Sequence, residues 1–432
     1  MKKKYLQFCF VFLSVSAFCQ KKNTEITLIS SETNLTTNLI QDAIDRCASV
    51  GGGTVHLSEG IFLSKSLELK SNVTLHIGKG CILQGSTDIN DYKNDAFIFG
   101  KDIFNVSIQG EGIIDGVDCF NAKGEEDFRG PHAIKLINCK NIRIEGIMIK
   151  NAANWAINCR YCSKAEIKNV SIRGGHDGLH TRFCDTFKVT GCDFRTGDDA
   201  FAGNDNRDFI VTNCKVNSSC NGFRMGCYNL TVRDCKLWGP GEYIHKIQKR
   251  NNMLAAFVHF SPSDEITQMN SGKWLIENVT VDQVDRFYMY NYRDGLWQTG
   301  KPVSSIQFKN IKATDILTAF NVIGDTLKQF SLKVKNSTFS FRRDIVYKDV
   351  LFKGSNVGSS SFFYVKNFNK IFLSNTTLNN SSSNSILNYG NGNSVILKAV
   401  ILNSNKIESF NVKNVKAVTI RDGKPCLTQN TQ

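Results

Sequence analysis

The chain has 432 residues, of which 41% are hydrophobic and 21% are charged, so it can bury a large core. Its formal net charge is +14, which favours anionic partners. Beyond the first twenty residues no apolar stretch is long enough to cross a bilayer, which excludes a protein built from membrane-spanning helices.

The first twenty residues read as a signal peptide. Three lysines, Lys2 to Lys4, precede an apolar run over residues 5–18 that ends in small side chains, the usual order of an export signal. We therefore expect a secreted, periplasmic or cell-surface protein, a monomer, whose partner is an acidic polysaccharide and not a nucleic acid. Residues 16–19 also resemble a lipobox, so a lipid anchor on Cys19 is an alternative.

A helix is predicted over residues 38–50. One face of this segment carries only apolar side chains, namely Leu39, Ile40, Ala43, Ile44 and Cys47. Three glycines at 51–53 end it. We expect this helix to cap the open end of the repeat described next, because an uncovered strand edge promotes aggregation.

A repeat occupies the middle of the chain. Its anchors are Cys139, Cys162, Cys184, Asn206 and Cys227, with steps of 23, 22, 22 and 21 residues. Three, five and eight residues after the anchors, all fifteen side chains are apolar. The alternation at offsets three and five predicts a short strand with one buried face. A Gly or Asn before offset eight, such as Gly146 or Asn169, predicts the bend into the next strand.

Because one such unit cannot bury its face alone, the units must stack. The predicted fold is all-β: a single-stranded, right-handed parallel β-helix over residues 21–432, clearest at 139–240, with a short N-terminal capping helix. Weaker copies of the strand pattern flank the clear coils, at Val73, Leu75, Ile77, Val106, Ile108, Val279, Val281, Ile306, Phe308, Ile371 and Leu373. Residues 379–393, rich in Ser, Asn and Gly, are expected to form loops.

Thirteen of the fifteen cysteines follow the leader. An odd number of cysteines cannot all pair within one chain. Their regular spacing indicates instead that several are small buried side chains packed in stacks.

Two polar clusters interrupt the coils: residues 175–178 read Gly-His-Asp-Gly and residues 197–200 read Gly-Asp-Asp-Ala. Asp177 is 21 residues from Asp198 and 22 from Asp199, which is one coil, so stacking brings the three carboxylates about 4.8 Å apart. Such crowding opposes folding, because like charges raise at least one pKa. A proton on one carboxyl beside ionised neighbours is what glycoside hydrolysis requires.

These three aspartates are therefore the predicted catalytic residues, with no metal and no other cofactor expected. Calcium binding by the clustered carboxylates and a purely structural Asp-Gly turn are the alternatives. The same register in two successive coils favours catalysis over the turn.

The region from residue 129 to 241 resembles glycoside hydrolase family 28, the polygalacturonases and rhamnogalacturonan hydrolases. The family's Asn-Thr-Asp-Gly corresponds to residues 175–178 and its Gly-Asp-Asp to residues 197–199, while residues 154–157 and 129–131 are also similar. The resemblance implies an inverting mechanism, in which Asp198 protonates the glycosidic oxygen while Asp177 and Asp199 activate the attacking water.

Two family elements are missing. Where the family has Gly-His-Gly, this chain has Cys-Asn-Gly at 220–222, and the Arg-Ile-Lys that grips a galacturonate carboxylate has no clean copy. Arg224, or His245 and Lys246, would supply positive charge toward an anionic sugar, whereas Lys249 and Arg250 fit a solvated face better. The predicted substrate-binding residues are His176, His180, Arg182, Asn221, Arg224 and Lys246. Segments 115–129 and 238–264 are expected to wall the cleft.

The leading hypothesis is thus a secreted glycoside hydrolase that cleaves an acidic, pectin-like polysaccharide. A polysaccharide lyase on the same fold would use calcium-bound carboxylates with Arg or Lys as base, and would leave an unsaturated uronate. A non-catalytic glycan-binding solenoid needs only the fold and the charge, but has no reason to crowd three carboxylates.

Overall fold

The computed structural model describes residues 24–30, 35–260, 271–292, 302–341, 361–380, 385–404 and 410–421. The predicted signal peptide with Cys19 lies outside these residues, and so does the end of the predicted cleft wall, 261–264. In the part of the chain that is described, no helix is long and apolar enough to cross a membrane.

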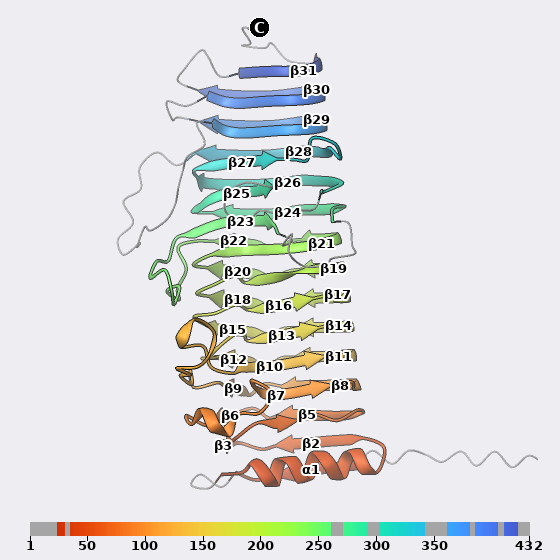
Figure 1. Cartoon of the computed structure of the whole chain (residues 1–432), viewed down its shortest axis with the longest axis vertical. Helices are drawn as coiled ribbons and strands as arrows, with labels where there is room; N and C mark the ends of the chain where they lie inside the picture. The colour runs from red at the N-terminus through yellow and green to blue at the C-terminus, as the bar shows by residue number, and fades with distance from the viewer. Residues whose placement is uncertain are drawn as a thin grey trace, which may run out of the picture.

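The described chain winds into a parallel β-helix, as predicted, with its coils stacked like rungs along one axis (Figure 1). A full coil contributes one strand to each of three sheets, which we name A, B and C in the order the chain visits them. Each strand pairs in parallel with its counterpart one coil further on, as β11 does with β14 in sheet A.

Strands that lie only in sheet A are β1 (Thr24–Leu28), β2 (Gly53–Leu57), β5 (Val73–Ile77), β8 (Phe104–Gly110), β11 (Lys140–Glu145), β14 (Ser163–Lys168) and β17 (Asp185–Thr190). Strands that lie only in sheet B are β3 (Gly60–Ser64), β6 (Cys81–Gly85), β9 (Ile113–Asp115), β12 (Met148–Lys150), β15 (Ser171–Gly174), β18 (Asp193–Thr196), β20 (Lys215–Ser218) and β22 (Lys236–Trp238).

Strands that lie only in sheet C are β4 (Leu67–Glu68), β7 (Ala96–Lys101), β10 (His132–Ile137), β13 (Ile157–Arg160), β16 (Leu179–Arg182), β23 (Met253–His259), β25 (Val284–Asn291) and β27 (Thr318–Ile323). Longer strands bend from one sheet into the next, and these are β19 (Phe201–Thr212), β21 (Asn221–Arg233), β24 (Trp274–Asp282), β26 (Ser305–Ile316), β28 (Phe330–Phe341), β29 (Ser361–Asn380), β30 (Ser385–Ser404) and β31 (Phe410–Arg421).

The helix α1 (Thr37–Ser49) covers the first coil, which confirms the predicted cap (Figure 1). Four of the five predicted apolar contacts are buried, but Leu39 is 47% exposed. Leu39 lies at the edge of the stripe that starts at Ile40 and recurs every three or four residues. Two short 3-10 helices, η1 (Ile89–Asp91) and η2 (Glu125–Asp127), lie in B-to-C connections of the early coils.

One residue with positive φ makes the bend from sheet A to sheet B in coil after coil. Gly146 (φ 79°) and Asn169 (φ 52°) occupy this position, as predicted. Later coils use asparagines whose side chains form a ladder, with Asn310 Nδ2 donating to Asn278 Oδ1 at 2.8 Å and Asn336 Nδ2 donating to Asn310 Oδ1 at 3.3 Å. Glycine and asparagine are the residues that adopt this left-handed conformation most easily, so the turn residues fix where each coil bends.

The core between the three sheets is built from columns of like side chains. All cysteines of the described residues, from Cys47 to Cys235, are buried free thiols. The Sγ atom of Cys162 donates to Leu136 O and that of Cys184 to Cys159 O, both at 3.4 Å. This confirms that the cysteines pack in stacks as small apolar side chains. Aromatic rings stack likewise, with the Phe201 and Phe223 centroids 4.4 Å apart and the planes 1° from parallel.

The expectation that residues 379–393 form loops is wrong for most of the segment. Residues 379–380 end β29 and residues 385–393 lie in β30, which pairs with β29 in register. The composition misleads because a β-helix coil needs asparagine at its bends. Asn391, for example, has a φ of 53° inside β30, and its amide donates to Asn367 one coil earlier at 3.3 Å.

Candidate active site

The two aspartate motifs lie on adjacent coils, at the turn from sheet B to sheet C. Asp177 lies between β15 and β16, and Asp198 and Asp199 lie between β18 and β19. The backbone ladder continues across this turn, where Gly178 N donates to Asp199 O at 2.9 Å. One oxygen of each of the three carboxylates lies within 4.8 Å of the others. The cluster predicted from the coil spacing is therefore present.

Asp177 and Asp199 are buried, and both oxygens of each carboxylate contact a donor. Asp177 is 3% exposed, its Oδ1 accepts from the backbone N–H of Asp199 at 3.1 Å, and its Oδ2 lies 2.8 Å from His180 Nδ1. Asp199 is 1% exposed, its Oδ1 accepts from Asn221 Nδ2 at 2.7 Å, and its Oδ2 accepts from Arg224 Nε. These contacts fix the direction of both carboxylates.

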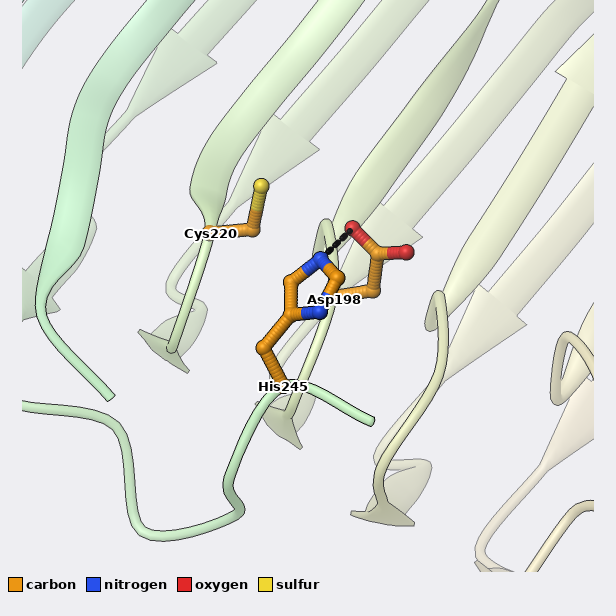
Figure 2. A group of neighbouring side chains, drawn as sticks. All are labelled: Asp198, Cys220 and His245. Atoms are coloured by element: carbon orange, nitrogen blue, oxygen red, sulfur yellow. Dashed lines mark ion pairs between the residues drawn. The ribbon is translucent and has the colours of Figure 1, made fainter. Parts of the chain in front are cut away.

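Asp198 is the most solvent-accessible of the three, with 18% of its side chain exposed. Its Oδ2 lies 3.5 Å from the Arg129 guanidinium, and its Oδ1 lies 3.5 Å from His245 Nε2 (Figure 2). The hydroxyls of Thr196 and Ser218 both donate to its backbone carbonyl at 2.7 Å. The main chain of Asp198 is thus held firmly while its carboxylate faces outward.

The tautomer of His245 follows from its backbone contacts. Its Nδ1 accepts from Ile247 N at 3.2 Å and from Gln248 N at 3.1 Å. A ring nitrogen that accepts carries no proton, so the proton lies on Nε2, which points at Asp198. The Nε2–H of His245 is therefore the group that donates to this carboxylate.

Glycines in the two motifs let the segment that carries His245, residues 239–252 between β22 and β23, pack on the cluster. A Cβ on Gly197 would lie 2.5 Å from Gly175 O and 2.7 Å from Ile244 O, and a Cβ on Gly175 would lie 2.4 Å from Lys246 Cε. Contacts this short with backbone oxygens cannot be relieved by a side-chain rotation. Gly197 is thus required by the close approach of this segment, whereas a Cβ on Gly175 would meet only the side chain of Lys246.

Burial raises the pKa of Asp177 well above its usual range, and the charges of the two neighbouring aspartates raise it further. Burial also raises the pKa of Asp199, although Arg224 opposes the shift. Burial acts on Asp198 in the same direction, but donation by His245 and the charges of the nearby arginines outweigh it and lower the pKa of Asp198. A proton shared by the cluster therefore resides on Asp177 or Asp199.

Of the six predicted substrate-binding residues, three contact the carboxylates of the cluster. His180, Asn221 and Arg224 hold Asp177 and Asp199, as described above. Lys246 pairs with Asp118, and this contact joins the two segments predicted to wall the cleft. Arg182 lies on β16, two residues after His180, and is partly exposed.

His176 keeps one ring nitrogen available. Arg129 NH1 lies 3.2 Å from His176 Nδ1, and because a guanidinium only donates, Nδ1 is the acceptor and Nε2 carries the proton. Burial and the charge of Arg129 lower the pKa of His176 to about 3, so the ring is neutral. Its Nε2 atom is buried and has no hydrogen-bond partner among the described residues. Such a group in a native protein usually meets a ligand or water.

The structure contradicts the predicted solvent exposure of Arg250, and it adds Arg129 to the residues that contact the aspartate cluster. The solvated face predicted for Lys249 is confirmed, but Arg250 is fully buried, and its guanidinium donates to the backbone carbonyls of Ser219 and Asn252. Arg129 was expected only as part of a motif, yet it contacts Asp198 and forms a 2.6 Å pair with Glu126. Its place in the Arg-Gly-Pro motif at 129–131 is the signal that points to it.

Among the described residues, two groups of side chains have the spacing of metal ligands, but their hydrogen bonds disfavour a metal ion in both. Asp198, Cys220 and His245 place ligand atoms within 4.8 Å of one another (Figure 2). However, His245 Nε2 carries a proton, and burial raises the pKa of the Cys220 thiol well above its usual range, so neither offers the lone pair that a metal needs. In the aspartate cluster, Arg224 and Arg129 already supply the positive charge that calcium would bring.

Comparison with known proteins places the cluster within a matched region. Residues 47–228 match the family described as glycosyl hydrolases family 28. An exo-poly-alpha-D-galacturonosidase of Dickeya chrysanthemi is 30% identical over 149 residues, which is 29% of this chain and 24% of that protein. The matched segments span about a quarter to a third of the length of the curated relatives.

Solved structures share the fold. A hyperthermoactive exopolygalacturonase from Thermotoga maritima superimposes with a TM-score of 0.58 at 18% identity, covering 88% of this chain and 92% of the other. PfbA, a surface adhesin of Streptococcus pneumoniae, superimposes with a TM-score of 0.51 at 13% identity, covering 91% and 93%. Since an adhesin has the same architecture, the fold alone does not separate a hydrolase from a binding protein.

Proposed function

Because residues 47–228 place this chain in glycoside hydrolase family 28, we propose that it is an exported hydrolase that cleaves an acidic polysaccharide by an inverting mechanism. The observation that carries the proposal is the cluster itself: three carboxylates crowd on two consecutive coils, two buried and oriented, one facing outward. Crowding of this kind costs stability and is usually retained for chemistry.

The contacts suggest a role for each carboxylate. Asp177 and Asp199 are almost completely buried, and all four of their oxygens contact donors. They are poorly placed to form a covalent bond with a sugar, but well placed to orient a water and take its proton. Asp198, the accessible one, is proposed to donate its proton to the glycosidic oxygen.

The proposed step balances as a hydrolysis. The water oxygen bonds to the anomeric carbon as the bond to the glycosidic oxygen breaks. The water proton passes to the pair formed by Asp177 and Asp199, and the proton of Asp198 passes to the departing oxygen. The sugar configuration inverts because water attacks from the face opposite the leaving group.

This assignment requires that the shared proton reaches Asp198 when substrate binds. In the free protein the pKa shifts leave Asp198 ionised. A sugar seated on Asp198 displaces its water, and a uronate adds a negative charge nearby. Both effects raise the pKa of a carboxyl, and they act most strongly on the one that faces the substrate.

An acidic, pectin-like substrate is proposed on the charge of +14 and on the similarity to the exo-poly-alpha-D-galacturonosidase of Dickeya chrysanthemi. The neutral Nε2–H of His176 is a donor for a sugar hydroxyl or carboxylate. The buried Oδ1 of Asn221, which has no partner in the described part of the chain, is an acceptor. Export is proposed from the leader-like residues 1–20.

The test is product analysis after incubation with polygalacturonate and rhamnogalacturonan. The proposal predicts new reducing ends and no ultraviolet absorbance, whereas a lyase produces an unsaturated, absorbing uronate and a binding protein releases nothing. Proton NMR during the first turnovers then reports the anomeric configuration. Initial release of the retained anomer would overturn the inverting mechanism, even if hydrolysis is found.

A further inference from the structure

The net positive charge of this protein is concentrated in its last third, because that part has few acidic residues. Residues 302–432 contain 17 Lys and Arg but only 6 Asp and Glu, whereas the whole chain has 53 against 39. The aspartate cluster, at residues 177–199, lies in the preceding part. The excess charge therefore calls for an explanation other than the catalytic cluster.

Sheet A shows how the charge is distributed on one continuous surface. On the coils of β11 to β17, two lysines on the outer face pair with carboxylates: Lys168 lies 3.0 Å from Glu145, and Lys188 lies 3.4 Å from Glu166. On β26 the same holds for Lys309, which lies 2.5 Å from Glu277. The charge of each of these three lysines is thus balanced by a carboxylate on the neighbouring coil, as charges on exposed surfaces usually are.

The balance ends on the next coils. Lys333 and Lys335 on β28 and Lys370 on β29 form no ion pair with any carboxylate of the described residues. Burial and the neighbouring charges of Lys335 and Lys370 lower the pKa of Lys333, so these side chains lie close enough to repel one another. Electrostatic repulsion between like charges without counter-ions is unfavourable, and binding of a ligand of opposite charge relieves it.

These lysines line a hollow of about 580 Å³ on the outer face of sheet A, which Lys273 also borders. Apolar surface contributes to the same hollow, from Leu275 on β24 and from Phe372 on β29. Strand pairing places Lys333 directly beside Phe372, and neighbouring strands are about 4.8 Å apart. The hollow thus combines apolar side chains with several lysine ammonium groups. The apolar side chains can pack against the face of a sugar ring, and the ammonium groups can pair with its carboxylates.

We propose that the outer face of sheet A over β24–β29 is a second binding surface for a linear anionic polysaccharide, separate from the aspartate cluster. The choice of a polysaccharide among polyanions rests on the proposed function. The surface lies on later coils than the cluster, and it lies on sheet A, whereas the cluster lies at the turn from sheet B to sheet C (Figure 1). It would hold a long polymer on the enzyme between cleavage events while leaving short oligosaccharides unaffected.

The test replaces Lys333, Lys335 and Lys370 together by Gln. A matched control replaces Lys140, Lys168 and Lys188 by Gln, which removes the same charge from the same sheet on the coils of β11, β14 and β17. Binding of polygalacturonate is measured by calorimetry in proteins that also carry Asp198→Asn, so that the polymer is not consumed. Fully methyl-esterified pectin serves as the uncharged probe.

The proposal predicts that the first variant binds polygalacturonate about tenfold more weakly, which is about 1.4 kcal/mol, and that the control binds within twofold of the parent. The difference should shrink at high salt, because screening weakens exposed charge pairs. Hydrolysis of short oligosaccharides by the corresponding variants with Asp198 intact should not change.

Equal loss in both triple variants, or equal binding of the esterified pectin, would overturn the proposal. So would a stronger dependence on these lysines for double-stranded DNA than for polygalacturonate. Failure of the proposed hydrolysis is a separate result, because the binding difference is measured in proteins that do not turn over.

Discussion

Replacing His245 by Phe tests which role Asp198 plays. In the folded protein, the Nε2–H of His245 points at Asp198 Oδ1 from 3.5 Å, and this donation helps to lower the pKa of Asp198. A hydrogen bond of this length to a charged acceptor contributes about 1 to 1.5 kcal/mol of free energy, which corresponds to about one pKa unit. The variant should therefore raise the pKa of Asp198 by about one unit.

The direction of the resulting change in the pH profile depends on the role. If Asp198 is the general acid, it must be protonated, and a higher pKa keeps it protonated to higher pH. The alkaline limb of kcat against pH, which reports the pKa values of the enzyme–substrate complex, should then move up by about one unit. If Asp198 is instead a base or a nucleophile, the acid limb moves up and the alkaline limb stays.

The assay is kcat at saturating concentrations of a short oligogalacturonide between pH 3 and pH 9, with His245→Gln as the control that retains a donor. The Gln variant should follow the parent profile more closely than the Phe variant. A shift confined to the acid limb would refute the assignment of Asp198 as the acid, and an unchanged profile would refute the coupling between His245 and Asp198.

Three further outcomes are expected. Arg224→Gln leaves the buried Asp199 carboxylate without its charged partner. The free energy of unfolding should therefore fall by about 3 kcal/mol and kcat by about 100-fold. A rise in KM alone would show that Arg224 binds substrate instead. Gly197→Ala places the added Cβ 2.7 Å from Ile244 O. Activity should fall, and the free energy of unfolding should fall by about 1–3 kcal/mol. Wild-type kinetics would contradict the packing of residues 239–252. Burial lowers the pKa of His259 to about 3, so the unfolded chain takes up a proton below about pH 6.5 that the folded one excludes, and stability is lost as the pH falls. Denaturant unfolding should show that His259→Phe loses about 2 kcal/mol less than the parent between pH 7 and pH 5, and equal losses would contradict the buried neutral ring.

The sequence predicts the fold and the cluster because both depend on spacing. A strand pattern that returns every 21 to 23 residues implies stacking, and stacking alone places Asp177 beside Asp199. The bends were predictable for the same reason, since Gly146 and Asn169 occupy one offset of the repeat.

What the spacing does not reveal is how segments outside the repeat fold back onto it. Residues 239–252 bring His245 to Asp198 and bury Arg250, and their sequence has no period that would place them. The same holds for Arg129, whose partner Asp198 lies about three coils further along the chain. The prediction of loops at 379–393 was wrong because irregular loops and the bends of this fold are both rich in asparagine.

The most direct test of the central claim is the activity of Asp198→Asn on polygalacturonate. The matched control is Asp193→Asn, which changes an aspartate of the same coil that pairs with Arg173 and Arg195. The account predicts that Asp198→Asn loses hydrolysis by about 1,000-fold or more at an unchanged unfolding midpoint, while Asp193→Asn stays within tenfold of the parent. Hydrolysis by folded Asp198→Asn at the parental rate would contradict the assignment of this cluster as the catalytic centre.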